Sequence, residues 1–287
     1  MWERAKGGTI PGWDLHTHTT ASDGTVSPGE LVRLARENGL AGIAITDHDT
    51  TAALEEARTE GRRRGIEVIP GIEINTDEGE GEFHFLGYLI DPGGPSLQAA
   101  LRRAREQRLV RARAILARLR DAGIGAEEER VLAAANGAPI CRPHIAAALV
   151  EAGHASTLGE AFHRYLGRRT PFYVPRTGLT VREAIAAIRG AGGVPILSHP
   201  RSLAAGTVLA LVPLGLLGVE VNHPDHSPEA AVRWQDLARR EGLAATGGSD
   251  YHGAKSIHPE QRLGSILAPP GALDGLRRAQ ERALTGA

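Results

Sequence analysis

The sequence contains a single cysteine, Cys141, so no disulfide can form within the chain. Because reducing compartments suit chains without disulfides, we expect a cytoplasmic protein. Apolar runs are also short: none approaches the ~18–20 residues that a membrane-spanning helix needs, and no membrane partner is expected. Aromatic residues are scarce, with 4 Phe, 3 Trp and 4 Tyr among 287 residues. This scarcity argues against a nucleic-acid surface built on base stacking, so any RNA would be held by its terminal phosphates.

The chain also lacks the common motifs of covalent catalysis. Gly-x-Ser-x-Gly is absent, no phosphate-binding P-loop is present, and Cys141 lies in no activating pattern. A nucleophilic side chain therefore does not explain any hydrolytic activity that the chain has.

Charge, in contrast, is abundant and unevenly distributed. Residues 96–176 contain fourteen arginines, no lysine and seven acids, a formal charge of about +7, whereas the whole chain carries −1. A basic segment beside an acidic body suits an anionic substrate that meets a cation-loaded site. The alternative is that these arginines only solvate the face of a helix.

Short apolar segments alternate with helix signals on both sides of this basic segment. Helix N-caps are expected at Ser27, Ser96, Thr180 and Ser227. Strands are expected at residues 12–18, 42–46, 67–75, 82–90, 194–198, 218–222 and 243–247. Repeated strand–helix units predict an α/β protein with a parallel sheet, open or closed into a barrel. Residues 96–174 show helical spacing and no strand pattern, so they predict a helical insertion.

Histidines and acids gather where the predicted strands end. His16 and His18 are two residues apart, and in a strand such residues point to the same side. Active sites of barrels and open α/β sheets lie at the carboxyl ends of strands, so these side chains are expected to converge. The candidate metal ligands are His16, His18, Asp23, His48, Glu73, His84, His199, Asp250 and His252. Nine ligands exceed the four that one tetrahedral ion uses, which predicts a cluster of two or three divalent ions.

The short histidine and aspartate patterns, and the residues beside the candidate ligands, are less specific indicators of a metal site. Each His-x-His or Asp-x-His pair, taken alone, is more often structural than metal-binding. Asp14, Asp47 and Asp49 adjoin ligand histidines and are expected to orient their rings by accepting N–H bonds. The histidines outside the clusters are expected at the surface; they are His154, His163, His223 and His258.

In chain order, Asp-Leu-His-Thr-His, Thr-Asp-His-Asp, Glu73, His84, Ser-His-Pro and Ser-Asp-Tyr-His resemble the motifs of the PHP (polymerase and histidinol phosphatase) superfamily. The resemblance covers residues 13–90 and 180–255. It implies a distorted (β/α)7, TIM-like barrel at 13–95 and 175–287, with 96–174 as a helical insertion that forms a substrate-binding cap. It also implies two or three ions, Mn²⁺ first, with Zn²⁺, Mg²⁺ or Fe as alternatives.

The resemblance further implies which residues share an ion. By position, the family pattern gives three ligand groups: His16, His18, Glu73 and Asp250; Glu73, His84 and His199; and Asp23, His48 and His252. Catalytic roles are expected for Asp23, His48 and His252, and either histidine could contact the phosphate or protonate the leaving oxygen.

Segments 82–88, 141–146 and 165–167 and the arginine-rich helix resemble the branch of the family with a helical insertion. That branch includes the 3′,5′-nucleoside bisphosphate phosphatase and the 5′→3′ exoribonuclease RNase AM. The implied activity is metal-dependent hydrolysis of nucleotide phosphomonoesters, or exoribonuclease action on short RNA, without an obligate protein partner. The alternatives are a phosphatase of a small metabolite such as histidinol phosphate, and a non-catalytic module. Expected substrate-binding residues are Arg108, Arg111, Arg113, Arg142, His144 and His226.

Overall fold

The computed structural model describes residues 12–78 and 81–285 and contains one seven-stranded sheet, in the order β1 to β7. The strands are β1 (Trp13–Asp14), β2 (Gly42–Ile45), β3 (Glu67–Glu78), β4 (Gly81–Tyr88), β5 (Val194–Leu197), β6 (Gly218–Asn222) and β7 (Ala244–Gly247). Every residue of β2 and of β5 is buried, as expected for apolar, β-branched segments covered on both faces.

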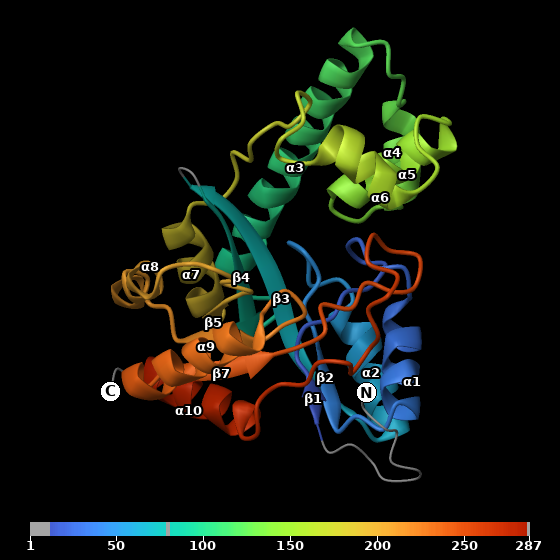
Figure 1. The fold of residues 1–287 in the computed structure, drawn as a ribbon. Coiled ribbons are helices and arrows are strands. Elements are labelled where there is room, and N and C mark those ends of the chain that lie inside the picture. The colour runs from blue at the N-terminus through green and yellow to red at the C-terminus, as the bar shows by residue number, and fades with distance from the viewer. Residues whose placement is uncertain (1–11, 79–80, 286–287) are drawn as a thin grey trace.

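The two ends of this sheet meet, which nearly closes it into a barrel with helices around it (Figure 1). Leu15 N donates a hydrogen bond to Gly247 O at 3.2 Å, and His18 N donates to Tyr251 O at 2.9 Å. These bonds join the chain that follows β1 to β7 and the chain beyond it. The distorted seven-stranded barrel predicted from the sequence is confirmed.

The parallel arrangement expected of the sheet does not extend to β4. This strand runs antiparallel to both of its neighbours, β3 and β5. No helix separates β3 from β4, so the chain returns directly, and two strands joined by a short turn must be antiparallel. The other neighbouring pairs are parallel.

The helices around the barrel begin largely where their caps predict. They are α1 (Pro28–Glu37), α2 (Leu54–Arg64), α7 (Val181–Gly190), α8 (Ala205–Leu209), α9 (Pro228–Glu241) and α10 (Ala272–Thr285), with a short 3-10 turn at Val212–Leu214. Ser27, Thr180 and Ser227 each accept a backbone N–H from the third residue after the cap, which confirms these three predictions.

The insertion is helical, as its sequence pattern predicts, and rises from one side of the barrel (Figure 1). Its helices are α3 (Pro95–Asp121), α4 (Glu128–Ala135), α5 (Arg142–Glu151) and α6 (Leu158–Ala161), followed by a π-helical turn at Phe162–Leu166. The predicted cap at Ser96 is wrong, because Gly94 precedes the helix and Pro95 already occupies its first turn. Within the described ranges, no helix is long and apolar enough to cross a membrane.

The long helix α3 joins two apolar cores. Leu97 and Leu101 pack into the main core beside the barrel, whereas Ile115 and Leu119 pack into a separate core with α4, α5 and α6. The insertion therefore has apolar packing of its own, and α3 fixes where it stands on the barrel.

Candidate metal centre

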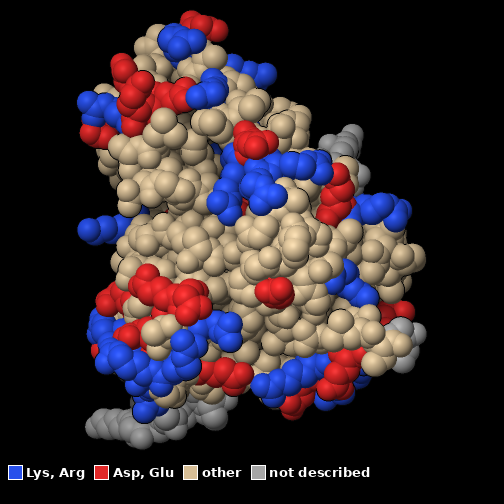
Figure 2. Space-filling view, turned by 180° about the vertical axis from the view of Figure 1, so that it is seen from behind, with Lys and Arg blue, Asp and Glu red and all other residues tan. Residues whose placement is uncertain are grey.

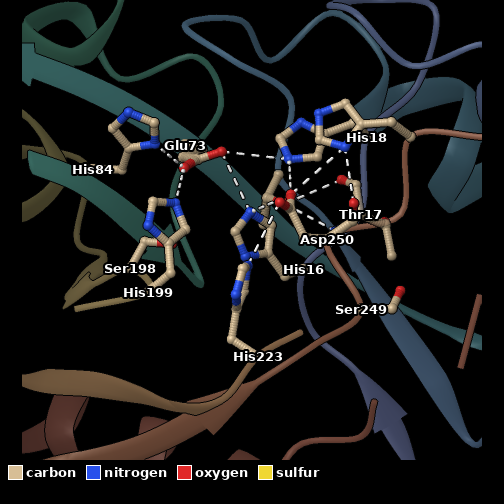
Figure 3. A network of polar contacts seen from close by, with 12 residues as sticks. His16, Thr17, His18, Glu73, His84, Ser198, His199, His223, Ser249 and Asp250 are labelled. Atoms are coloured by element: carbon tan, nitrogen blue, oxygen red, sulfur yellow. Dashed lines mark hydrogen bonds and ion pairs between the residues drawn. The ribbon is translucent and has the colours of Figure 1, made fainter. Parts of the chain in front are cut away.

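The polar clusters come together at one end of the barrel, on the strands themselves or on the segments that follow them (Figure 3). His16 and His18 follow β1, and both side chains are completely buried. His48 follows β2 and pairs with Glu73 of β3 through a parallel bridge. Strand ends that are neighbours in the sheet thus present their side chains to a common space.

The first group surrounds one oxygen of Glu73. Nε2 of His16 and Nε2 of His18 each lie 3.3 Å from Glu73 Oε2. The same two nitrogens lie 3.3 and 3.2 Å from Asp250 Oδ1. Four ligand atoms from the segment after β1, from β3 and from the segment after β7 therefore face one another.

The second group surrounds the other oxygen of Glu73. His84 Nδ1 lies 2.7 Å from Glu73 Oε1, and His199 Nε2 lies 3.4 Å from it. Figure 3 shows Glu73 between these two imidazoles on one side and those of His16 and His18 on the other. Glu73 is 1% exposed and belongs to both groups, which is the geometry of a bridging carboxylate.

The third group surrounds Asp23. Its Oδ1 lies 3.5 Å from His252 Nε2 and 3.8 Å from His48 Nε2, and His18 completes this group. His48 Nδ1 also lies 3.1 Å from Glu73 Oε2, which links the third group to the first. The structure thus brings together all nine residues that the sequence singles out as ligands.

These atoms fit divalent cations. Two ligands bound at about 2.1 Å to one tetrahedral ion stand about 3.4 Å apart, close to the separations found here. Among the described residues, neither His18 Nε2 nor Asp23 Oδ1 has a hydrogen-bond partner, although both are buried. Buried polar atoms without partners are costly, and an ion would satisfy them.

The charges of the site support the same conclusion. Burial acts to raise the pKa of Glu73, but His48, His16 and His84 outweigh it and hold this pKa well below its usual range. Burial lowers the pKa of His48, which favours the neutral imidazole, whereas the carboxylates of Asp250 and Glu73 outweigh burial and raise the pKa of His18 to about 10. Anionic carboxylates and neutral imidazoles are the donor set of Zn²⁺, Mn²⁺ and related ions.

The groups that orient the ligands differ from those predicted. Within residues 12–78 and 81–285, no ligand ring donates a hydrogen bond to the three aspartates expected to orient them. Asp14 accepts bonds from Ser249 N and Oγ and from Gly264 N. Asp47 accepts from Thr19 and Ser22, and Asp49 from Arg108. These aspartates hold loops and the insertion in place, and that prediction is wrong.

The carboxylate that orients a ligand ring is Glu220 of β6, to which sequence reasoning gave no role. His16 Nδ1 lies 2.9 Å from Glu220 Oε1, and Glu220 is completely buried. Burial alone would raise its pKa, but His16 and His223 outweigh burial and lower the pKa of Glu220 to about 2. The signal was present, because a glutamate between two valines of a buried strand must have a partner.

His223 was predicted to be a surface residue and is instead 4% exposed. Its ring lies 5.8 Å from that of His16 and 5.0 Å from that of His199, and its Nε2 lies 3.5 Å from Asp250 Oδ2. His223 directly follows β6, just as His16, His48 and His199 come shortly after β1, β2 and β5. That shared position is the signal that the prediction overlooked.

His226, in contrast, uses both ring nitrogens on the backbone. Nδ1 donates to Val221 O at 2.7 Å, and Nε2 accepts from Arg201 N at 3.1 Å. This arrangement argues against the substrate contact predicted for His226, since no ring nitrogen is left to make it.

Arg108 and Arg111 lie in the buried stripe of α3, between its two apolar cores. Arg108 donates from Nε to Asp49 Oδ2 and from Nη2 to Asn75 Oδ1, both at 2.6 Å. Arg111 donates from Nε to Val174 O at 2.8 Å. The guanidinium group of Arg108 therefore joins the insertion to the barrel, whereas that of Arg111 bonds within the insertion.

The other two arginines predicted to bind substrate, Arg113 and Arg142, lie elsewhere on the insertion. Arg113 is more than half exposed and pairs with Glu128 on the insertion surface, which argues against the phosphate clamp predicted for it. Arg142 begins α5, where its Nη1 donates to Leu166 O at 3.3 Å and its guanidinium lies over the ring of Phe162.

His144 stands beside the third ligand group. It is 8% exposed, and its Nδ1 accepts a hydrogen bond from Cys141 N at 3.0 Å. Burial lowers the pKa of His144, and the charge of nearby Asp23 acts in the opposite direction. Because Nδ1 is an acceptor, the neutral ring carries its proton on Nε2, and a hydrogen bond with the backbone of Ser22 acts to raise the pKa of His144.

Known proteins share both the sequence and the fold. A family model described as PHP domain matches residues 14–140. The 5′-3′ exoribonuclease Rnm of Salmonella typhimurium is 38% identical over 278 residues, which cover 94% of each protein. The 3′,5′-nucleoside bisphosphate phosphatase of Chromobacterium violaceum is 35% identical over 267 residues, 89% of this chain and 94% of the relative.

A crystal structure from Bifidobacterium adolescentis, described as a metal-dependent phosphoesterase, superimposes with a TM-score of 0.86. It is 34% identical, and the match covers 94% of this chain and 96% of that one. The likeness therefore includes the barrel and the helical insertion together.

Proposed function

Because this chain belongs to the PHP domain family, we propose that it hydrolyses phosphorylated nucleotides, as 3′,5′-nucleoside bisphosphates, as short RNA degraded from its 5′ end, or as both. The chain is a metal-dependent phosphoesterase and thus a hydrolase, which confirms the activity expected from the sequence and removes the non-catalytic alternative. The observation that carries the proposal is the convergence of nine ligands on overlapping groups that share Glu73.

The residues of the three groups would hold two or three divalent ions, with Mn²⁺ as the proposed metal. Such ions would supply positive charge that stabilises a phosphoryl group during hydrolysis. Glu73 would serve two of them, since each of its oxygens faces a different set of imidazoles. Burial of His16 and His18 excludes bulk water from that side of the site.

Substrate is proposed to approach from the side of the second and third groups. His48, His199 and His252 are 13–14% exposed, whereas His16 and His18 are not exposed at all. Asp23, His48 and His252 are therefore the proposed catalytic residues at this edge. His252 Nδ1 donates to Asp250 O at 2.8 Å, which leaves the Nε2 lone pair directed towards the site.

The insertion is proposed to act as a cap that binds a phosphate of the substrate. His144 presents an Nε2–H beside Asp23, and Arg142 stands two residues before it at the start of α5. A helix start is favourable for an anion, because its backbone N–H groups are unpaired and its dipole is positive there. Figure 2 shows basic side chains gathered where the insertion meets the barrel, as an anionic substrate requires.

The setting proposed for this reaction is the cytoplasm, without an obligate protein partner. It is supported by the single cysteine, Cys141, which is free and buried.

Phosphate release from a set of substrates tests the proposal. With Mn²⁺, the purified chain is expected to hydrolyse adenosine 3′,5′-bisphosphate or to shorten a 5′-phosphorylated oligoribonucleotide, and to leave histidinol phosphate intact. Turnover of histidinol phosphate, with neither nucleotide substrate consumed, would show that the proposed substrate class is wrong.

A further inference from the structure

One carboxylate, that of Glu220, contacts ligands of two different groups at once. Oε1 accepts a hydrogen bond from His16 Nδ1 at 2.9 Å. Oε2 accepts from the backbone N–H of His199 at 2.8 Å and from Ser198 Oγ at 2.9 Å. His16 belongs to the first ligand group and His199 to the second, and they follow different strands, β1 and β5.

Both ligands need external support for the conformation in which they are found. His199 has φ of +25°, in the left-handed region that non-glycine residues rarely adopt, so its backbone must be held. His16 must carry its proton on Nδ1, because its Nε2 faces Glu73 and Asp250 and has to offer a lone pair to a cation. Glu220 meets both needs through opposite ends of one carboxylate.

We infer that Glu220 is a positioning residue that couples the first and second ion sites, fixing the His16 tautomer at one oxygen and the His199 backbone at the other. The inference rests on the proposed metal centre. Only a carboxylate accepts hydrogen bonds at both ends, which explains why a charged residue stands in the middle of a buried strand.

Replacing Glu220 by glutamine separates this role from packing, since the two side chains have nearly the same shape. If the amide nitrogen faces His16, it donates to Nδ1 and moves the ring proton to Nε2, the atom that should bind the ion. If the amide nitrogen faces β5 instead, it opposes the backbone N–H of His199. Either orientation disturbs one ligand group while the volume of the core is preserved.

Mn²⁺ titration of the metal-free protein, with metal content after dialysis, tests this inference. For Glu220→Gln we expect Mn²⁺ affinity at one or more sites to fall about 10- to 100-fold. Glu220→Asp keeps two acceptor oxygens and is expected to recover part of that affinity. Glu229→Gln is the matched control, because Glu229 is an exposed residue of the first turn of α9, and it should bind Mn²⁺ as the wild type does.

The outcomes separate this inference from the proposed function. Wild-type affinity and stoichiometry in Glu220→Gln would overturn the inference. In that case a wild-type chain that binds Mn²⁺ and releases phosphate leaves the proposed function standing. A wild-type chain that binds no divalent ion would overturn both.

Discussion

Arg108 of the insertion and Asp49 of the barrel form a buried ion pair, with Nε 2.6 Å from Oδ2 and side chains 6% and 2% exposed. Asp49 directly follows His48, a candidate ligand. This ion pair ties the helical insertion to the segment that carries His48.

Arg108→Met should therefore destabilise the protein strongly. The substitution keeps much of the apolar stem but leaves Asp49 as a buried charge without its partner, which costs about 3–5 kcal/mol. Urea denaturation measures the change. Arg103→Met is the control: its pair with Glu183 is on the surface, where such pairs contribute about 1 kcal/mol or less. If Arg108→Met and Arg103→Met lowered the free energy of unfolding by the same amount, the buried pair would not stabilise the protein more than the surface pair does.

His223→Ala should weaken metal binding although this residue matches none of the ligand motifs. Its ring packs beside His16 and His199, and its Nε2 approaches Asp250, so its removal loosens ligands of both groups. We expect a loss of about tenfold or more in Mn²⁺ affinity and in kcat/KM. His258→Ala, at an exposed position, should change neither. If His223→Ala had the Mn²⁺ affinity and kcat/KM of the wild type, His223 would not support the ligands.

Metal affinity should increase with pH. Burial acts to lower the pKa of His18, but the carboxylates of Asp250 and Glu73, 3.2 and 3.3 Å from its Nε2, outweigh burial and raise this pKa to about 10. At neutral pH the metal-free chain thus holds a proton on His18, and an ion must displace it. Each displaced proton makes apparent affinity rise about tenfold per pH unit below that pKa. Titrations at pH 6, 7 and 8 measure this effect, and a constant affinity would contradict it.

Cys141 should be unreactive while the protein is folded. Burial raises the pKa of its thiol above the usual range, and this effect exceeds the opposing effect of Arg108, whose Nη1 lies 3.0 Å from Sγ. Since only the thiolate reacts, alkylation by iodoacetamide at pH 8 should be at least about tenfold slower in the native protein than in urea. Equal rates in the two states would show that the thiol is accessible.

Local features of this chain could be predicted from its sequence because neighbours along the chain determine them. Ser27, Thr180 and Ser227 cap helices through bonds to residues three positions away. His16 and His18 share a side because of strand geometry, whatever the rest of the fold does. That the nine candidate ligands lie on strands or shortly after them depends only on such local rules and on the order of strands.

Pairings between distant residues could not be predicted in the same way. Glu220 and His16 are 204 positions apart, and nothing in either segment identifies the other as its partner. In the sequence, Arg108 is one of many arginines of a predicted helix. Only the packing of α3 against the barrel buries it beside Asp49.

The most direct test of the metal centre is the metal content of the purified chain, measured by mass spectrometry for the wild type and for Glu73→Gln. Glu73 joins two of the three ligand groups, so its loss should remove most of the bound metal and reduce kcat/KM at least about 10³-fold, the equivalent of several kcal/mol. The account predicts two or three divalent ions per wild-type chain. A wild-type chain that hydrolyses phosphoesters with no bound metal would contradict it.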